Sequence, residues 1–196
     1  METWLIKGHT LEYIDETHTY LVDGIVKPSI TQILKIKFGK KYDNVDKDVL
    51  QRASELGTAT HKAIEDYCKQ GIVTDLKELQ NFIFLQKIFR FDVLDNEVPI
   101  ILFDDEDKPV ACGRLDLVLY TGVLSLGDIK RTYTIDKEYL AYQLNLYRIG
   151  YQQCYGKEIK ELCGLHLRED VRKLYSIPIN EALAKELIKE YLTKGE

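Results

Sequence analysis

The sequence lacks any apolar run long enough to span a bilayer, and we therefore expect no membrane partner. Residues 1–10 contain no basic segment followed by an apolar stretch, so we expect no signal peptide and a cytoplasmic location. Repeats, low-complexity stretches and a dividing linker are also missing. At 196 residues the chain is long enough for one compact domain and short for two, which predicts a single domain over residues 1–196.

Closely spaced cysteines are missing as well. The four cysteines form no C-x-x-C pair and are widely scattered, at positions 68, 112, 154 and 163. Without a secretion signal, we interpret them as reduced thiols in the core.

A positive net charge is also absent. The 27 basic and 32 acidic residues give a net charge of −5, which argues against a protein that coats duplex DNA through bulk electrostatics. It does not exclude a metal-dependent enzyme that acts on phosphate, because such a site needs carboxylates and its cations reverse the local field. The basic residues are uneven: Lys35, Lys37, Lys40 and Lys41 lie within seven positions, a cluster that could guide a nucleic-acid strand or form an ordinary wet surface.

The first half of the chain is predicted to be mainly helical. Alternation of apolar and polar residues predicts a β-hairpin over 10–22 that ends at Asp23-Gly24. Pro28-Ser29 then indicates the start of a helix over 30–37. A helical pattern over 46–69 is interrupted at Gly57-Thr58, where Thr58 could act as an N-cap; Gly71 ends this pattern. A further helix is expected over 76–91.

The second half has a different character. Three β-rich runs separated by tight turns predict an antiparallel meander over 98–103, 110–120 and 123–129. A long helix should begin at Asp136 and stop at Gly156, two strands should follow over 162–167 and 174–179, and Asn180 should cap a last helix over 181–194. The predicted fold class is α/β, with a mixed central sheet flanked by helices.

Two consecutive apolar strands each carry a carboxylate, Asp116 in the first and Asp128 in the second. Positions i and i+2 of a strand share a face, so Asp128 and Lys130 should point the same way. Ile129 should then face the core, with its backbone carbonyl free to act as a ligand. Asp116 on the paired strand can reach the same spot.

Two carboxylates and a carbonyl form a hard-oxygen site suited to Mg²⁺ or Mn²⁺. Lys130 beside the ion could orient an attacking water and stabilise charge on a phosphate. Taken alone, a D-x-K sequence is more often an exposed ion pair at a strand end, worth at most about 1 kcal/mol. The neighbouring motifs favour the catalytic interpretation.

Six short motifs, in order and at compatible spacings, cover most of the chain. On these motifs the sequence resembles the PD-(D/E)XK nuclease superfamily, in particular its RecB-type, phage exonuclease and mitochondrial genome-maintenance exonuclease branch. The motifs are Pro-Ser-Ile-Thr-Gln-Ile-Leu at 28–34, Gly-Thr-Ala-Thr-His-Lys-Ala-Ile-Glu at 57–65, Glu-Val-Pro at 97–99, Gly-Arg-Leu-Asp at 113–116, Asp-Ile-Lys at 128–130 and Gln-Leu-Asn-Leu-Tyr at 143–147.

The resemblance implies a restriction-endonuclease-like core and a role for each matched residue. One or two ions would be held by His61, Glu97, Asp116, Asp128 and the Ile129 carbonyl. Gln143 and Tyr147, one helical turn apart, would lie over the active site with Lys130. DNA would be contacted by Ser29, Thr31, Lys62 and Arg131. Glu65 could hydrogen-bond His61 and fix its tautomer.

Most of these residues also have an ordinary explanation. A histidine on an amphipathic helix is more often packed or at the surface than a ligand. Glu65 could be a solvated helix charge, Glu97 a turn acid, and Ser29 only an N-cap. Lys62 and Arg131 could equally be solvated cations.

The implied function is a metal-dependent DNA exonuclease that acts on DNA ends, mainly single strands, in phage or prophage recombination, replication or repair. A single-strand annealing or recombination protein would be its partner, in the cytoplasm of a bacterium or a phage-infected cell. Some relatives hold an iron–sulfur cluster through four cysteines, but the wide spacing here predicts none. Two alternatives remain: a catalytically silent nuclease-fold module that binds DNA or protein, and a structure-specific endonuclease.

Overall fold

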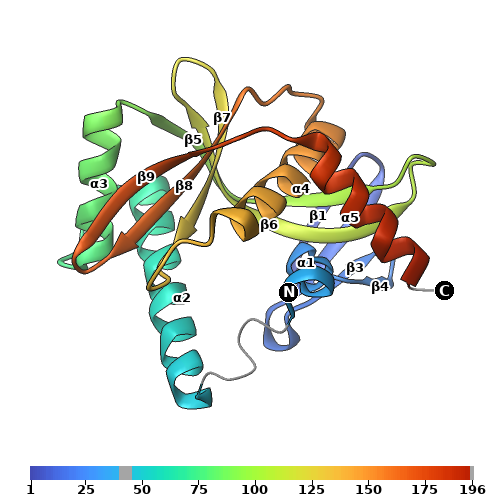
Figure 1. The fold of residues 1–196 in the computed structure, drawn as a ribbon, viewed down its shortest axis with the longest axis horizontal. Coiled ribbons are helices and arrows are strands. Elements are labelled where there is room, and N and C mark those ends of the chain that lie inside the picture. Colours follow the sequence, from blue (N-terminus) through green and yellow to red (C-terminus); the bar gives the residue numbers. More distant parts are fainter. Residues whose placement is uncertain (40–45, 195–196) are drawn as a thin grey trace.

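The computed structural model describes residues 1–39 and 46–194 (Figure 1). This part of the chain contains one antiparallel β-sheet, one mixed β-sheet and five helices. The fold class is therefore α/β, as predicted. The first sheet has the order β1-β2-β3-β4 and the second the order β5-β6-β7-β8-β9.

The first sheet is a small antiparallel meander near the N-terminus. Its strands are β1 (Glu2–Ile6), β2 (His9–Ile14), β3 (Thr19–Val22) and β4 (Ile25–Lys27), with a 3₁₀ turn, η1 (Asp15–Thr17), between β2 and β3. Lys7-Gly8 and Asp23-Gly24 all have positive φ, from 52° to 85°. Two central residues with positive φ are typical of the tight type I′ hairpin turn.

The second sheet is the larger one and is antiparallel except where β7 pairs with β8. Its strands are β5 (Asp92–Phe103), β6 (Pro109–Tyr120), β7 (Leu124–Lys130), β8 (Glu161–Arg168) and β9 (Val171–Ile177). Two parallel neighbours need a crossover, and helix α4 (Lys137–Tyr155) provides it. The Asp136 side chain accepts a hydrogen bond from the Tyr139 backbone N–H at the start of α4, and Gly156 (φ 65°) ends the helix.

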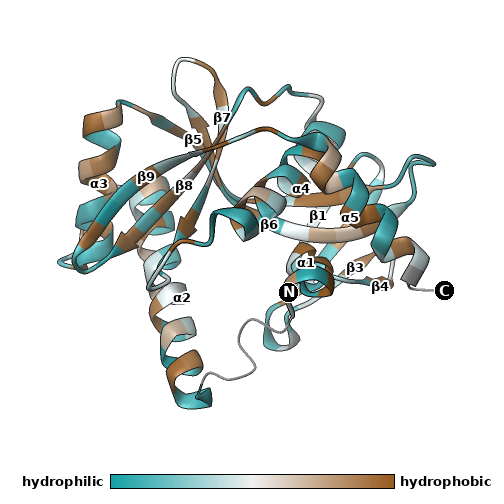
Figure 2. Ribbon diagram, in the orientation of Figure 1, coloured by the Kyte–Doolittle hydropathy of each residue, from teal (hydrophilic) through white to brown (hydrophobic). Residues whose placement is uncertain are grey.

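Helices cover both faces of the second sheet. The other four helices are α1 (Ile30–Phe38), α2 (Lys47–Gln70), α3 (Lys77–Phe89) and α5 (Glu181–Lys194). Leu126 of β7 packs with Leu144 of α4 on one face, whereas Ile129 and Leu165 pack with Phe82 of α3 on the other. Figure 2 shows the apolar residues concentrated in the central strands, such as β5 and β7. Because each face is buried, the strands are held in a fixed register.

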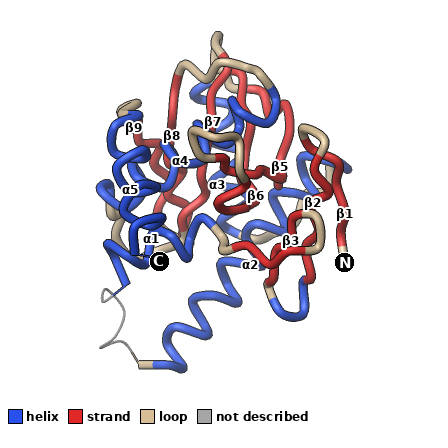
Figure 3. Tube along the Cα trace, turned by 90° about the vertical axis from the view of Figure 1, so that its right-hand side faces the viewer, coloured by secondary structure: helices blue, strands red, loops and turns tan. Residues whose placement is uncertain are grey.

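The N-terminal sheet packs on the β5–β6 hairpin through a third apolar cluster, which includes Leu11, Val22, Ile101 and Phe103. Helix α1 is joined to the same hairpin, because the Cys112 backbone N–H donates to the Pro28 carbonyl (2.9 Å). Helix α2 behaves differently: its first residues, 47–56, are mostly exposed, and in Figure 3 this end extends away from both sheets.

Several predicted elements are confirmed. The antiparallel meander, the α4 helix with its start at Asp136, and the helix at 181–194 lie where expected. The helices predicted at 30–37 and 76–91 are Ile30–Phe38 and Lys77–Phe89, and the strands predicted at 162–167 and 174–179 are Glu161–Arg168 and Val171–Ile177.

Other predictions were wrong. Helix α2 is continuous through Gly57, so Thr58 is not an N-cap; a single interior glycine costs only about 1 kcal/mol, which 24 helical residues can offset. The hairpin predicted over 10–22 is confirmed as the antiparallel pair β2–β3, but it does not end at Asp23-Gly24: this turn leads the chain into β4, and the hairpin is half of a four-stranded sheet. Strand β5 starts at Asp92, six residues before the predicted start.

Two predictions concern small groups of residues. All four cysteines are free thiols; Cys112 and Cys163 are buried, whereas Cys68 and Cys154 are half-buried. Of the basic cluster, Lys40 and Lys41 lie outside the described residues.

No helix in the described part of the chain has the length and apolar character of a membrane span.

The packing of α4 on the sheet predicts a large cost for truncating its buried face. Leu144→Ala should lower the free energy of unfolding by about 2–5 kcal/mol, because the Leu144 side chain is fully buried and a cavity remains. Leu5→Ala is the matched control: Leu5 is 79% exposed, and its truncation should change the unfolding free energy by less than about 0.5 kcal/mol. Urea denaturation measures both, and equal effects would contradict this packing.

Candidate metal centre

Three carboxylates lie on one line across neighbouring strands. In the β5–β6 ladder, Glu97 lies opposite Asp116, between the pairs Asn96–Leu117 and Val98–Leu115. The β6–β7 ladder ends at Leu117–Gly127, so Asp116 and Asp128 are the first residues beyond its last pair. The strand register thus brings together carboxylates that are far apart in sequence.

Strands β6 and β7 separate at this point, and a side chain replaces the backbone acceptor of the ladder. The Oδ2 of Asp116 accepts a hydrogen bond from the Ile129 backbone N–H at 2.6 Å. The N–H and C=O of one strand residue point to the same side of the strand, so the Ile129 carbonyl also points towards β6. The Ile129 side chain is buried on the opposite face of the sheet, as predicted.

His61 of α2 completes the cluster. Its Nδ1 lies 3.6 Å from Asp116 Oδ1 and 3.6 Å from Glu97 Oε1. One ligand atom from each of these three residues lies within 4.8 Å of the others. The structure therefore brings together His61, Glu97 and Asp116, which the sequence predicted as ligands from three separate motifs.

Glu97 holds its position through an unusual backbone conformation. Its φ is +51°, a left-handed value that costs a non-glycine residue about 1 kcal/mol or more. A register shift between Val93 and Asp95 lies just before it in the β5–β6 ladder. Such irregularities re-aim side chains, and here the carboxylate is directed at His61.

Asp128 and Lys130 form a buried ion pair on the adjoining strand. Lys130 Nζ lies 2.6 Å from Asp128 Oδ2, and the two side chains are 21% and 3% exposed. They therefore lie on the same side of β7, as predicted. The same Asp128 oxygen is buried, and the Lys130 ammonium is the cation that faces it. A buried carboxylate is costly without a cation beside it, so Lys130 stabilises the charge on Asp128.

The donor set suits a hard divalent cation. Carboxylate oxygens, a backbone carbonyl and one imidazole are ligands that Mg²⁺ and Mn²⁺ accept, whereas cysteine thiolates are not part of the cluster. Charge balance is compatible with an ion, because a neutral, ligating His61 leaves the three carboxylates of Glu97, Asp116 and Asp128 facing only two cations, Lys130 and Arg114, among the described residues near them. These residues fit a bound divalent ion.

The cluster shifts the ionisation of its members. Burial opposes the charged form of His61, but Asp116 and Glu97 outweigh it and raise the pKa of His61 to about 9. Burial raises the pKa of Asp116 to about 7, against the effect of the His61 charge. Burial also opposes the charge on Lys130, yet Asp128 and Asp116 raise the pKa of Lys130 above its usual value. Lys130 therefore stays a cation at neutral pH.

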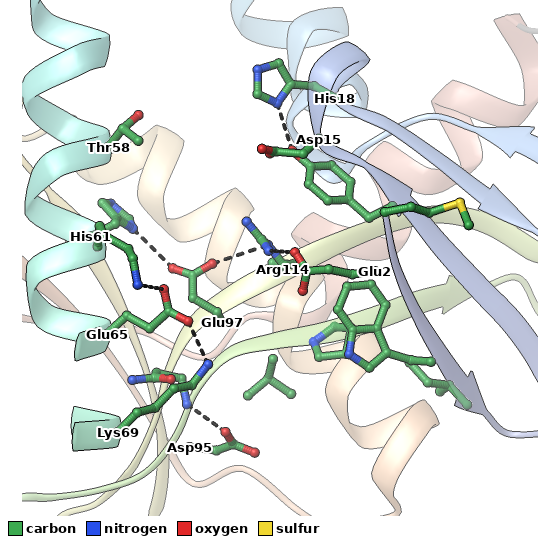
Figure 4. A pocket seen from close by; sticks show the side chains of 18 of the residues that line it. Glu2, Asp15, His18, Thr58, His61, Glu65, Lys69, Asp95, Glu97 and Arg114 are labelled. Carbon is green, nitrogen blue, oxygen red and sulfur yellow. Dashed lines mark hydrogen bonds and ion pairs between the residues drawn. The ribbon is translucent and has the colours of Figure 1, made fainter. Parts of the chain in front are cut away.

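Arg114 is a member of the site that the sequence prediction missed. Its guanidinium lies 3.4 Å from Glu97 Oε2 and 2.9 Å from Glu2 Oε1, and it stacks on the ring of Tyr13 at 4.9 Å. Figure 4 shows the Glu97 carboxylate between His61 and Arg114. The available signal was its position two residues before Asp116, on the same side of a strand.

The cluster borders a cavity of about 1140 Å³ that is lined by α2, the N-terminal sheet and β5. His61, Lys69, Glu97 and Arg114 line it (Figure 4). Trp4 also belongs to the lining. Its carboxylates and cations largely neutralise one another: Lys69 pairs with Glu65 at 2.7 Å, as Arg114 does with Glu2 and Glu97.

Gln143 and Tyr147 lie on one face of α4, buried against the sheet. Gln143 Oε1 is buried and has no hydrogen-bond partner among the described residues. The ring of Tyr147 occupies space that a side chain at position 113 would fill: a Cβ on Gly113 would lie 2.9 Å from Tyr147 Cε1. This explains the glycine in the motif that carries Asp116.

Ser29 and Thr31 line a smaller cavity of about 300 Å³ together with Tyr147 and Arg114. The Ser29 hydroxyl accepts from the Gln32 backbone N–H (3.2 Å), while the Gln32 side chain accepts from the Ser29 backbone N–H, which is a complete capping box. The N-cap explanation of Ser29 is therefore confirmed, and contact with a phosphate stays a prediction.

The remaining predicted residues point elsewhere. The predicted hydrogen bond between Glu65 and His61 is not formed. Glu65 instead pairs with Lys69 (2.7 Å) and Lys62 (3.8 Å), because these lysines lie one turn away on the same helix. Lys62 also binds Asp66. Arg131 pairs with buried Glu78 of α3 at 2.7 Å, on the sheet face that carries Ile129.

Comparisons with known proteins add little to this geometry. No protein-family model matches the chain, and no curated protein matches it. Among solved structures, the crystal structure of SSO0001 is similar with a TM-score of 0.47 and 14% identity, covering 86% of this chain and 75% of that one. A likeness this distant supports no argument about fold or function.

The ionisation of His61 can be tested directly. In the metal-free protein the imidazole of His61 should titrate near pH 9, because Asp116 and Glu97 stabilise its charged form. A folded-state pKa above the usual 6.5 stabilises the folded protein fully below pH 6.5, and this stabilisation is lost as pH rises through 9. Imidazole NMR titration measures the value, with His61→Gln to assign the signal.

Asp116→Asn should move the titration of His61 towards its ordinary value. Asp23→Asn is the matched control, because Asp23 pairs with another histidine, His9, at 2.7 Å and is remote from this cluster in the strand order. A His61 signal that titrates below its ordinary pKa, or that ignores Asp116→Asn, would contradict the described cluster.

Proposed function

We propose that this protein is a divalent-metal-dependent deoxyribonuclease of the PD-(D/E)XK superfamily, with a restriction-endonuclease-like core in its second sheet. The observation that carries the proposal is the line of Glu97, Asp116 and Asp128 across β5, β6 and β7, with Lys130 two residues after the last carboxylate. His61 from α2 faces this line. Together they form an oxygen-rich cation site next to a fixed ammonium group.

The chemistry follows from these groups. His61, Glu97, Asp116, Asp128 and the Ile129 carbonyl would hold the ion. A bound Mg²⁺ or Mn²⁺ supplies the positive charge that activates water and stabilises charge on the phosphate. The remaining steps depend on residues of the chain itself.

Lys130 acts as a cation rather than as a base. Burial opposes its charge, but Asp128 and Asp116 outweigh burial and keep the pKa of Lys130 raised. Its ammonium group can donate hydrogen bonds to a phosphate oxygen, where negative charge grows as the bond breaks. The buried carbonyl oxygen of Gln143 has no hydrogen-bond partner in the described part of the chain, and Gln143 and Tyr147 would position Lys130 or the sugar-phosphate backbone.

The motif resemblance favours an exonuclease that acts on DNA ends during recombination, replication or repair, in a phage or prophage setting. A single-strand annealing or recombination protein would then be its partner. A silent nuclease-fold module is the alternative from another class. The complete set of His61, Asp116, Asp128, Lys130 and Gln143 argues against it, and calorimetry that finds no Mn²⁺ binding would support it.

Hydrolysis of DNA should require both the metal and the Asp128–Lys130 pair. We expect degradation of linear DNA with Mg²⁺ or Mn²⁺ and none with EDTA. Lys130→Met should lower kcat by about 10²–10³-fold, because one charge-stabilising donor is removed. Asp128→Asn should abolish the metal-dependent activity. Product release from a labelled strand measures all of these.

The matched control is a second pair at the same spacing. Lys160 lies 2.6 Å from Glu158, and both are largely exposed. The Lys160 backbone N–H donates to the carbonyl of Leu124, the first residue of β7, whereas Lys130 is the last residue of that strand. Lys160→Met should leave the activity unchanged. A wild-type protein that is inert on every form of DNA, or an active Lys130→Met variant, would overturn the proposal.

Exonuclease and endonuclease action can be separated with one comparison. An enzyme that requires a free end should degrade linear single-stranded DNA and leave circular single-stranded DNA intact. Gel electrophoresis of both substrates with equal enzyme and Mn²⁺ gives the answer. Rapid linearisation of the circle would instead identify a structure-specific endonuclease.

A further inference from the structure

Cationic and aromatic side chains extend the sheet surface beyond Lys130. Asp128 and Lys130 pair with Gly164 and His166 of β8, which pair in turn with Tyr175 and Lys173 of β9. Paired positions share a sheet face, so Tyr175 and Lys173 lie on the face that carries Asp128 and Lys130. We define the β8–β9 strip as Tyr133, Lys137, Arg168, Lys173 and Tyr175.

The strip is built from stacked cation–aromatic pairs. Lys137 Nζ lies 5.1 Å from the ring centre of Tyr175, and the Arg168 guanidinium lies 5.0 Å from that of Tyr133. The Tyr133 side chain is 84% exposed, more than any other large apolar side chain in the described part of the protein. Its ring therefore offers a face to solvent.

The segment that carries Tyr133 is attached to the sheet. It belongs to the connection from β7 to α4, directly after Lys130. The Nε2 of buried His166 donates a hydrogen bond to the Thr132 carbonyl at 2.7 Å. Figure 1 shows this connection and the β8–β9 turn at the same end of the sheet. Tyr133 is thus held next to the end of β7 that carries the proposed catalytic pair.

The cations of the strip have no acidic partner among the residues that the structure describes. Lys137, Arg168 and Lys173 form no ion pair with any residue described in the structure, and Arg168 Nε is buried without a hydrogen bond. Glu169 and Asp170 occupy the turn beyond the strip. In the large cavity, by contrast, Lys62, Lys69 and Arg114 are all paired with carboxylates. A phosphate chain is therefore complementary to the strip rather than to the cavity.

We propose that the β8–β9 strip binds single-stranded nucleic acid next to the cleavage site, an inference that rests on the proposed nuclease function. Lys137, Arg168 and Lys173 would contact phosphates, and an unpaired base would stack on Tyr133 beside the Arg168 guanidinium. Two strand spacings separate β7 from β9, about 10 Å, so one strand can contact Lys130 and the strip together. Paired bases in a duplex hide the faces that Tyr133 requires, which makes the surface selective for single strands.

Binding without metal tests the strip separately from catalysis. Fluorescence anisotropy with a labelled oligothymidylate in EDTA should show about tenfold weaker binding for Lys137→Gln/Lys173→Gln at low salt. The slope of log K against log salt should fall by about 1.4, or about 0.7 for each lost phosphate contact. The control, Lys157→Gln/Lys189→Gln, removes two exposed lysines elsewhere and should leave both quantities unchanged.

The stacking step has its own variant. Tyr133→Ala should weaken binding of the oligothymidylate about fivefold or more, because stacking of one base contributes about 1–3 kcal/mol. Tyr120→Ala is the control, since Tyr120 is also exposed (47%) but pairs with Leu124, at the opposite end of β7 from Lys130. A blunt duplex of equal length should bind more weakly and be insensitive to Tyr133→Ala.

Each outcome separates the two proposals. Thymidine 5′-p-nitrophenyl phosphate occupies only the cleavage site, so its hydrolysis should be unchanged in the strip variants. If the wild type binds the oligothymidylate through the strip but hydrolyses neither substrate, the nuclease proposal fails and the strip stands. If the strip variants bind like the wild type, the strip is wrong even in an active nuclease. Equal duplex binding with an equal loss in Tyr133→Ala would overturn the single-strand assignment.

Discussion

The separation of β6 from β7 after the Leu117–Gly127 pair is the constraint on which the site depends. A ladder that continued would hide the backbone of Ile129, and two facing carboxylates would crowd each other across it. Asp116 instead accepts the Ile129 N–H with one oxygen and presents the other to His61. One side chain therefore closes the end of the ladder and opens a site at the same point.

The cost of gathering buried acids explains the rest of the arrangement. Carboxylates in a partly desolvated cluster are unfavourable unless cations or donors face them. In the metal-free protein a protonated His61, Lys130 and Arg114 supply these charges, which is why the pKa values of His61 and Lys130 are raised. A divalent ion would replace the proton on His61 as the main counter-charge. The raised pKa values of His61 and Lys130 thus indicate that the site favours positive charge.

Much of this could be predicted from the sequence, because it depends on short-range patterns. The i, i+2 rule placed Asp128 and Lys130 on one side of β7 and Ile129 on the other, and caps fixed the start of α4. The pairing of Glu65 with lysines rather than with His61 could not be predicted, since both partners satisfy the same helical spacing. The continuity of α2 through Gly57 depends on the helical propensity of all its residues, which a local Gly-Thr signal does not report. Arg114 was missed because its partners, Glu2 and Tyr13, lie about a hundred residues away in sequence.

The negative net charge of the protein becomes understandable once charge is considered by location. The acids of the metal centre and of the large cavity are matched by nearby cations, whereas the cations at the end of β8 and β9 have no carboxylate paired with them in the described structure. A polyanion responds to the potential within about 10 Å of it at ordinary ionic strength, not to the total charge of the chain. A small acidic protein can therefore present a local basic surface next to an acidic ion site. The mean composition of the sequence hides this separation, and the register of β7, β8 and β9 reveals it.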